Sequence, residues 1–396
     1  TSSQKDPCSD RTSISSRMAT QTEAPRLDLA YLRSVDSRLD ELAAAIQTSA
    51  VNDVVRAWSQ QGSRALPKKV LVSGSSGYLG EVLVRTFVQL GVEVIGMDRQ
   101  PGPNTQVVAD ICDADAVSEA ARDCDAIFHT AALHAPNAPR HSEEEYVAVN
   151  VKGTTNLWNA AVANNAKAFI HTSTTSLMVT STVKDIEARG GLAFLGVEEG
   201  DEASTEEPRN KYGRSKLRAE MLLEEGSAAA VSGPSVIVLR APRFFPEDAF
   251  DSDALAKSGT LEKSPELSNG SGARTKALEL LGTRTSLVDL LDAHMRAMAL
   301  ALSDESRRFR RFLLTPPALL ERGEITPDAG GAKAAAKKVF ETKFPEATSL
   351  FEKHGWTVPE TVPRIYDGSL ACRPVESGGL GWTPKWTFPF LLRALG

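Results

Sequence analysis

Apolar residues follow two alternating patterns along this chain, and the alternation predicts its fold. Short apolar runs typical of strands stand at "KKVLVSG", "VEVIGMD", "TQVVADI", "DAIFHTAA", "AFIHTST" and "SVIVLR". Stretches with helical periodicity separate most of them, most clearly at 142–164 and 211–230. Strands alternating with helices predict parallel pairing, and runs that are apolar on both faces predict a sheet covered on both sides. We therefore expect an α/β fold with a doubly wound parallel sheet.

The chain before this region is organised differently. Residues 27–60 carry apolar positions at helical spacing, so we expect two helices within an N-terminal helical extension of residues 1–66. Residues 1–17 are rich in Ser, Thr and Arg and have no apolar core, which is not the pattern of a secretory signal. We expect them to be disordered or non-native, with Met18 as a candidate start and an organelle transit peptide as the weaker alternative.

The rest of the chain is expected to form a sheet domain and a smaller C-terminal lobe. Residues 67–245 and 283–316 carry the regular pattern and are assigned to the sheet domain. Residues 246–282 and 317–396 are less regular, and we assign them to the lobe, which we expect to cover and bind the substrate. The acidic stretch 185–207 is expected to be a surface loop.

Composition narrows the classes of partner. The 396 residues carry a formal net charge of −6, with both signs spread along the chain and no long basic run, so we expect neither a nucleic-acid nor a membrane partner. No apolar run reaches the ~18–20 residues of a spanning helix. Cys8, Cys112, Cys124 and Cys372 are scattered and not at metal-ligand spacing, so we expect no metal site and reduced thiols in a cytoplasmic protein.

A glycine-rich motif follows the first predicted strand. "VSGSSGYLG" places Gly74, Gly77 and Gly80 where a strand gives way to a helix. Glycine allows a sharp turn and close approach of the backbone to a pyrophosphate, and the helix N-terminus directs N–H groups at that anion. We therefore predict a Rossmann-type dinucleotide site that also includes Tyr78 and Leu79.

The second predicted strand ends in an acid that bears on the choice of dinucleotide. Asp98 stands 18 residues after Gly80, where a carboxylate can accept hydrogen bonds from the adenosine ribose and repel a 2′-phosphate. This favours NAD, although the neighbouring Arg99 could receive the phosphate of NADP. Two more strand ends are expected to border the cofactor: Asp110-Ile111 and Ala131-Ala132.

A tyrosine and a lysine in "RNKYGRSKLRAE" stand four residues apart, on one face of a predicted helix. A free phenol has a pKa of about 10, too high for a good base at neutral pH, and a nearby ammonium lowers it. We therefore predict that Tyr212 donates and accepts protons and that Lys216 lowers its pKa and binds the nicotinamide ribose. The hydroxyls of "HTSTTS" at 171–176 supply candidates for holding a substrate oxygen.

Taken together, these stretches resemble the extended short-chain dehydrogenase/reductase family and, within it, the NAD-dependent epimerase/dehydratase group. Further matching stretches are "VNVKGTTNL" at 149–157, "VLRAPRFF" at 238–245, "LVDLLDAH" at 287–294 and a closing pattern that ends in "LGWTP". The resemblance spans residues 68–390. It implies catalytic Thr174, Tyr212 and Lys216, with Asn150 near the active site as part of the cofactor region.

Some positions depart from the family pattern and leave the substrate open. Met178 stands where epimerases often have Tyr, and Thr175 where sugar-nucleotide dehydratases have Asp, which disfavours a 4,6-dehydratase. Arg243 replaces an Asn near the substrate diphosphate; it could bind phosphate or pair with an acid. His134 could line the substrate site or be structural.

We therefore predict an NAD-dependent oxidoreductase or epimerase that moves a hydride between the cofactor and an alcohol or ketone carbon of a nucleotide sugar or related small molecule. The alternative within enzymes is a dehydrogenase or reductase of steroid-like or small hydroxy/keto substrates. The alternative outside enzymes is a dinucleotide-binding scaffold or redox sensor. The family commonly pairs the helices at 142–164 and 211–230 in a homodimer, which is the expected assembly.

Overall fold

The computed structural model describes most of the chain from the end of the N-terminal extension onward. The described residues are 49–60, 66–134, 141–197, 206–230, 232–245, 284–303, 309–321, 323–324, 331–353, 358–362, 364–385, 387–389 and 392. The predictions for residues 1–17, for the first N-terminal helix and for 246–282 lie outside them.

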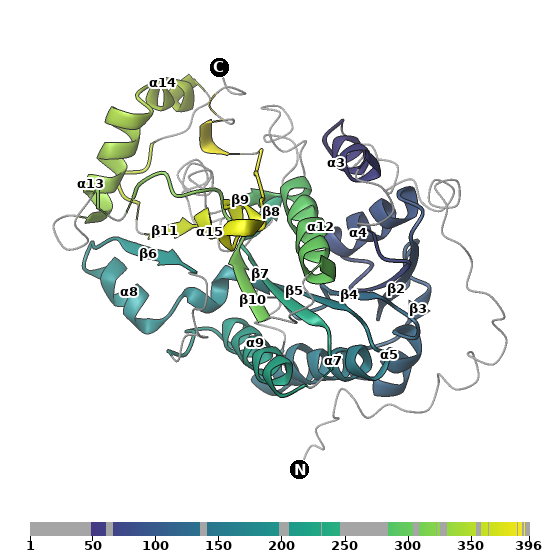
Figure 1. Ribbon diagram of the computed structural model, residues 1–396. Helices are drawn as coiled ribbons and strands as arrows, with labels where there is room; N and C mark the ends of the chain where they lie inside the picture. The colour runs from purple at the N-terminus through teal and green to yellow at the C-terminus, as the bar shows by residue number, and fades with distance from the viewer. Residues whose placement is uncertain are drawn as a thin grey trace, which may run out of the picture.

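A seven-stranded parallel sheet forms the centre of the molecule, which confirms the predicted fold class (Figure 1). Each apolar run quoted above forms one of its strands. The strands, in spatial order, are β10 (Phe309–Leu313), β7 (Ser235–Ala241), β5 (Ala168–Thr174), β4 (Ala126–His129), β1 (Lys69–Ser73), β2 (Glu93–Asp98) and β3 (Val107–Val108). The strands β1, β4, β5 and β7 are almost wholly buried, whereas the short β3 at the edge is partly exposed.

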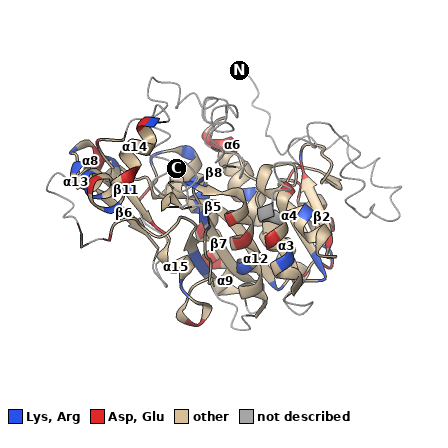
Figure 2. Cartoon of the chain, turned by 90° about the horizontal axis from the view of Figure 1, so that it is seen from above, with Lys and Arg blue, Asp and Glu red and all other residues tan. Residues whose placement is uncertain are grey.

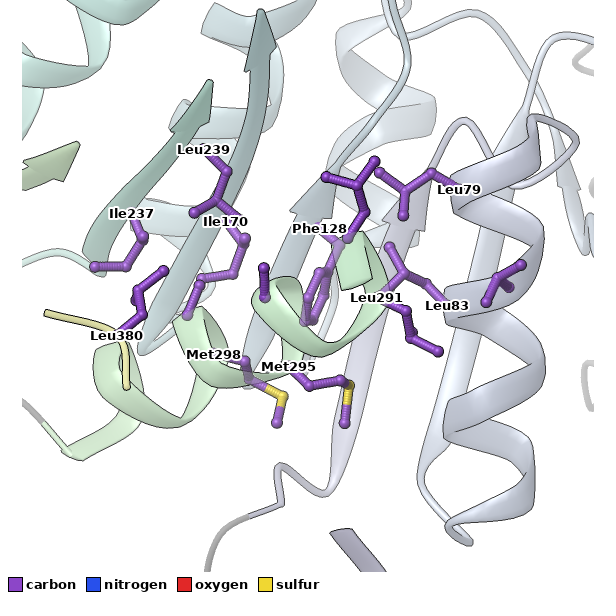
Figure 3. Packing of buried hydrophobic residues seen from close by; sticks show 14 of the residues in the cluster. Leu79, Leu83, Phe128, Ile170, Ile237, Leu239, Leu291, Met295, Met298 and Leu380 are labelled. Atoms are coloured by element: carbon purple, nitrogen blue, oxygen red, sulfur yellow. The ribbon is translucent and has the colours of Figure 1, made fainter. Parts of the chain in front are cut away.

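Helices cover both faces of this sheet (Figure 1). One face packs against α4 (Tyr78–Gln89), α12 (Leu287–Ser303) and, from the N-terminal extension, α3 (Ser49–Gln60). The other face packs against α5 (Ala114–Ala120), α7 (Gly153–Ala163) and α9 (Lys211–Ala229). Figure 3 shows the first of these cores, in which Leu83, Phe128 and Leu291 meet between α4, β4 and α12.

The smaller lobe is built from chain segments on both sides of α9. Its two-stranded parallel sheet pairs β6 (Ala193–Gly196) with β11 (Arg364–Asp367). Its helical segments are α8 (Ser181–Ala188), α13 (Gly331–Lys337), η7 (Lys338–Lys343) and α14 (Glu346–Lys353). The prediction of a surface loop over 185–207 is therefore wrong for its first half, because α8 and β6 pack into the lobe. Phe340, Phe351 and Phe388 meet edge to face in the lobe core.

Three further elements, two short strands and one short helix, lie near the end of the central sheet and its core. β8 (Arg243–Phe245) and β9 (Arg284–Ser286) pair in parallel just beyond the end of β7. α15 (Ser369–Cys372) packs its apolar residues into the core beside α12. Lys, Arg, Asp and Glu lie along both the lobe and the sheet domain (Figure 2). Within the described ranges, no helix has the length and apolarity needed to span a bilayer.

Candidate active site

The glycine-rich loop lies between β1 and α4. Gly74 has φ +82°, and a Cβ there would lie 2.6 Å from Thr130 Oγ1, so only glycine fits. A Cβ on Gly80 would lie 2.0 Å from Gly74 O, so the first turn of α4 rests directly on the loop. Gly77 is the N-cap of α4 and makes no side-chain cap, which leaves backbone N–H groups as the donors at this helix end. The loop therefore has the form that binds a phosphate anion.

Residues on either side of the loop differ in their exposure. Tyr78 is exposed at the start of α4, whereas Leu79 is buried in the core. Ala131 follows β4 and lies against the loop, since its backbone N would be 2.7 Å from a Cβ on Gly74. Ala131 and Ala132 are half-buried, so small residues border the loop as the sequence predicts.

Asp98 lies beside the same loop. Its Oδ2 accepts a hydrogen bond from Ser76 N at 3.1 Å, and its Oδ1 accepts one from Gln100 N at 2.9 Å. The hydroxyl of Ser76 is 2.9 Å from that of Thr105, which fastens the segment after β2 to the loop. Arg99 is exposed. The structure thus places the acid next to the glycine loop, and it adds Ser76 and Thr105, which the motif alone does not single out.

The end of β3 is held by local contacts. Asp110 Oδ1 accepts a hydrogen bond from Cys112 N at 2.9 Å, which is the pattern of an Asx turn. The side chain of Ile111 packs against Gly153, where a Cβ would lie 2.5 Å from Ile111 Cδ1. Asp110 is half-buried and Ile111 is buried, so the predicted cofactor role of Asp110 and Ile111 stays a prediction.

Asn150 connects three elements. It lies on the π-helical segment η4 (Ala148–Lys152) and is 1% exposed. Its Oδ1 accepts from Leu133 N at 2.8 Å, and its Nδ2 donates to Leu133 O at 3.1 Å and to Ser215 Oγ at 2.9 Å. Ser215 lies on α9 between Tyr212 and Lys216. Asn150 therefore joins the loop after β4 to the helix that carries the predicted catalytic pair.

Tyr212 lies in the first turn of α9, close to the end of β5. Asn210 caps this helix by accepting from Gly213 N at 2.7 Å. A Cβ on Gly213 would lie 2.9 Å from Ser176 O, so the helix start approaches the segment after β5 closely. Tyr212 is 7% exposed, packs with Tyr146 and is hydrogen-bonded to the side chain of Thr174.

The hydroxyls of the last three residues of β5 have different partners, and the partners distinguish their roles. Thr172 Oγ1 is 2.9 Å from His294 Nε2 on α12, and Ser173 Oγ donates to Glu220 Oε1 on α9. Thr174 is the hydroxyl of the "TST" sequence that meets Tyr212, and its Oγ1 also accepts from Ser176 N at 3.1 Å. The structure therefore brings together Thr174 and Tyr212.

Lys216 lies one turn further along α9 and is 1% exposed. Its Nζ donates to Thr172 O at 2.7 Å and lies 3.0 Å from His171 Nε2. Burial lowers the pKa of Lys216 to about 7, and the negative charge of Glu220 opposes this shift.

The prediction that the pKa of the Tyr212 phenol is lowered is wrong. Burial raises the pKa of Tyr212 to about 12, and the hydrogen bond with Thr174 offsets only part of that rise. The side chain of Lys216 contacts the end of β5 rather than the phenol oxygen. A spacing of four residues places Tyr212 and Lys216 on one face of the helix. It does not determine where the Nζ atom of the long lysine side chain lies.

The two predicted substrate residues lie at the same edge of the sheet. The ring of His134 is 5.9 Å from the ring of Tyr212, and the residue as a whole is exposed, although partial burial of the ring lowers the pKa of the imidazole to about 4. Arg243 begins β8, two residues after Ala241, which pairs with Thr174. Arg243 is also the register partner of Arg284 on β9. Their predicted contact with substrate stays a prediction.

The sequence motifs do not single out a group of buried charged side chains on α9, β7 and β10. Glu220 is fully buried and accepts from Arg240 Nη2 at 2.7 Å and from Arg311 Nε at 3.0 Å. The two arginines hold the pKa of Glu220 below its usual value against the opposing effect of burial. Glu220 lies four residues after Lys216, and that spacing is the signal that could have drawn attention to it. Within the described residues, no group of His, Cys, Asp and Glu is placed to hold a metal ion.

The fold and site define a class of protein, the short-chain dehydrogenases/reductases of the extended type. The chain belongs to the NAD dependent epimerase/dehydratase family, whose model matches residues 70–308, more than half of the chain.

Curated relatives match over shorter stretches. A 3-beta-hydroxysteroid dehydrogenase from Mycolicibacterium neoaurum is 37% identical over 121 residues, 28% of this chain and 33% of that protein. An N-acetyl-alpha-D-glucosaminyl-diphospho-ditrans,octacis-undecaprenol 4-epimerase from Escherichia coli O157:H7 is 28% identical over 181 residues, 45% of this chain and 49% of that protein. These matches thus span a third to a half of each relative.

Solved structures share the fold over most of the chain. A short-chain dehydrogenase/reductase superfamily protein from Agrobacterium tumefaciens, described with bound NAD, has a TM-score of 0.54 at 18% identity and covers 83% of this chain and 95% of its own. A UDP-N-acetylglucosamine 4-epimerase from Bacillus cereus has a TM-score of 0.51 at 17% identity and covers 83% of this chain and 97% of its own.

Proposed function

We propose that this protein is an NAD-dependent oxidoreductase or epimerase that acts on an alcohol or ketone carbon of a nucleotide sugar or related small molecule. The observation that carries the proposal is the placement of Tyr212 beside the Thr174 side chain at the sheet edge where the glycine loop and Asp98 also lie. In an open α/β sheet, ligands bind outside the carboxyl ends of the strands.

The residues present fit an NAD molecule. The glycine loop has no room for side chains at Gly74 and Gly80, and α4 presents uncapped backbone N–H groups that suit the pyrophosphate. Asp98 would hold the adenosine ribose and Lys216 the nicotinamide ribose. NAD is favoured over NADP because a carboxylate at Asp98 repels a 2′-phosphate. When bound, NAD supplies the acceptance and donation of hydride.

Proton transfer falls to Tyr212. With a pKa of about 12, the phenol is protonated at neutral pH and can donate its proton to a carbonyl oxygen of the substrate. Thr174 would donate to the same oxygen and fix its position. The opposite direction, in which an alcohol loses its proton, requires the phenolate, and Lys216, one turn further along α9 and charged below about pH 7, would supply the cation that stabilises it.

The experiment is a thermal-shift screen of the NAD-loaded full chain against UDP-, GDP- and dTDP-sugars and sterols, followed by absorbance measurements of NADH. An epimerase would convert its substrate with no net NADH, whereas a dehydrogenase would accumulate it. A shift with sterols alone would favour the second candidate, a steroid-type dehydrogenase, which the 37% identity to the mycobacterial relative supports.

Tyr212→Phe tests the chemical role directly. We expect turnover of the substrate found by the screen to fall by about 10²–10⁴-fold, because the proton donor is lost, while NADH binding is kept. Tyr366→Phe, in the lobe strand β11, is the matched control and should keep its turnover. Unchanged turnover in Tyr212→Phe would favour a non-catalytic dinucleotide-binding protein.

The proposed assembly is a homodimer formed through the outer faces of η4–α7 and α9 in a cytoplasmic protein. α7 and α9 are neighbours on the sheet, and Met221 on α9 is among the large apolar side chains that are exposed. Within the described part of the chain, Cys112, Cys124 and Cys372 form no disulfide, which is consistent with the reducing cytoplasm. Light scattering of the full chain tests the assembly.

A further inference from the structure

Two histidines lie side by side beneath the candidate site. His129 on β4 and His171 on β5 are register partners, and their ring centroids are 5.0 Å apart. Both are buried, at 1% and 0% exposed, between the sheet and the helices α7 and α9. Burial and the charge of Lys216 lower the pKa of both imidazoles well below 6.5, so both are neutral at pH 7.

His129 has partners for both ring nitrogens. Its Nδ1 is 2.9 Å from Ser73 Oγ and its Nε2 is 2.9 Å from Thr154 Oγ1. The Thr154 hydroxyl donates its one proton to Asn150 O at 2.6 Å, so His129 Nε2 must be the donor toward Thr154. His129 is therefore a structural histidine whose hydrogen bonds are complete.

His171 differs, because its ring has one partner and that partner is Lys216. Its Nε2 lies 3.0 Å from Lys216 Nζ, whereas its Nδ1 is buried with no hydrogen-bond partner among the described residues. An ammonium can only donate, so Nε2 accepts and the ring proton is on Nδ1. A buried unpaired N–H is costly, so packing alone does not favour a histidine at this position.

Lys216 is held by two acceptors on β5. Its Nζ donates to His171 Nε2 and to Thr172 O, which uses two of its three N–H donors. The third is left for another ligand. These two bonds hold the Lys216 side chain against His171 and Thr172 of β5, directly before Ser173 and Thr174 at the end of that strand.

We propose that His171 is a positioning residue for Lys216: its neutral imidazole accepts a hydrogen bond from the ammonium, holds it at the end of β5 and favours its charged form. The functional meaning of this inference rests on the proposed NAD-dependent activity, in which charged Lys216 binds the nicotinamide ribose. The hydrogen bond itself does not depend on that activity.

The other charged or titratable groups around Lys216 come from each element packed against it. Glu220 on the same helix favours the ammonium, while the tyrosine and the histidines are neutral at pH 7. Among the described residues these groups are Tyr212 and Glu220 on α9, His171 on β5, His129 on β4 and His134 after β4, and Arg240 on β7 is paired with Glu220. His171 is the one within hydrogen-bond distance of Nζ.

The test measures the pKa of Lys216 in the nucleotide-free full chain by NMR of lysine labelled with ¹³C at Cε, the signal being assigned with Lys216→Arg. We expect His171→Phe to lower this pKa by about one unit, since the ammonium loses an acceptor. His171→Met removes the same acceptor and replaces the Phe variant should that variant not fold. His171→Gln, which offers an amide oxygen, should restore the parent value.

His129→Gln is the matched control, because it alters the neighbouring histidine without touching Nζ, and it should leave the Lys216 pKa unchanged. A Lys216 pKa equal to that of the parent in both His171→Phe and His171→Met would overturn the proposal. An equal fall of the Lys216 pKa in His129→Gln would also overturn it, because the effect would then come from any change among the buried side chains and not from the hydrogen bond of His171.

A second readout links the inference to function. The NADH dissociation constant, measured by fluorescence titration across pH, should rise as the pH passes the Lys216 pKa, and in His171→Phe this rise should begin about one pH unit lower. A parent that does not bind NADH would contradict the proposed function but leave the NMR result standing. Binding with an identical pH midpoint in parent and His171→Phe would contradict the role given to His171.

Discussion

At the scale of single residues, the glycine loop and Asp98 are the parts of the site that the sequence predicts best. Their signal is local: three glycines at fixed spacing between an apolar run and a helix, and an acid at the end of the next run. The backbone of Gly74 and the close approach at Gly80 give the physical reason for the pattern.

Gly77→Ala tests the loop with little change to the fold. Gly77 has φ −86°, which any residue adopts, and a Cβ would lie 3.3 Å from Gly74 O. We expect NADH binding to weaken by about tenfold or more, because an added methyl narrows the space that the loop leaves for a pyrophosphate, with the melting temperature nearly unchanged. In the control Gly196→Ala, where a Cβ makes only ordinary contacts, binding should be as in the parent. Equal affinities in both variants would remove the loop from the binding site.

Other residue roles could not be read from spacing. Five hydroxyls follow one another from Thr172 to Ser176, and only the fold shows that the first and second turn toward α12 and α9. The pKa of Tyr212 depends on its burial and on where Lys216 Nζ ends, which are properties of contacts between residues about 40 apart or more.

At the scale of elements, α9 organises the site. Tyr212, Lys216 and Glu220 stand at intervals of four, so they share the face that packs on the sheet. The sequence predicts this helix and the six quoted strands because their apolar periodicity is strong. It does not predict β6, whose four residues lie in an acidic stretch and pair with a strand more than 160 residues later.

Glu220→Gln tests how much the buried carboxylate on α9 contributes to the stability of the fold. Removal of the carboxylate leaves Arg240 and Arg311 buried beside a neutral group, so we expect a loss of about 3–5 kcal/mol in the free energy of unfolding, measured with urea. Glu225→Gln changes an exposed acid on the same helix and should stay within about 0.5 kcal/mol of the parent. A similar small effect for Glu220→Gln would show that the cluster does not hold α9 to β7 and β10.

At the scale of the whole molecule, described elements lie on both sides of the family match: α3 lies before it, and α13, η7, α14 and β11 of the lobe lie after it. Val54 and Trp58 of α3 are buried in the core beside α12, although they lie before the family match begins. Leu313, Tyr366 and Val197 form a shared cluster that joins β10 to the lobe. The sequence predicts a lobe from its irregular pattern, but not that α8 and β6 belong to it.

Buried neutral histidines make the stability of the whole molecule depend on pH. The folded pKa values of His129 and His294 lie below the unfolded value of 6.5, that of His294 at about 4, so the unfolded chain binds more protons as the pH falls below about 6.5. Stability from these groups is present above that pH and is lost below it. The free energy of unfolding of the parent is expected to fall between about pH 7 and pH 5. We expect this fall to be smaller by about 2 kcal/mol in His129→Gln and in His294→Gln.

Urea unfolding at the two pH values measures this loss in each variant and in the parent. A loss that is the same in the parent and in both variants would show that these histidines titrate alike in the folded and unfolded chain.

The proposed function requires above all that the loop between β1 and α4 binds a pyridine nucleotide. Isothermal titration of NADH and NADPH into the full chain measures this binding. We predict saturable binding of NADH to one site per chain and weaker binding of NADPH, because Asp98 disfavours a 2′-phosphate. If neither nucleotide binds, the proposed NAD-dependent function is contradicted.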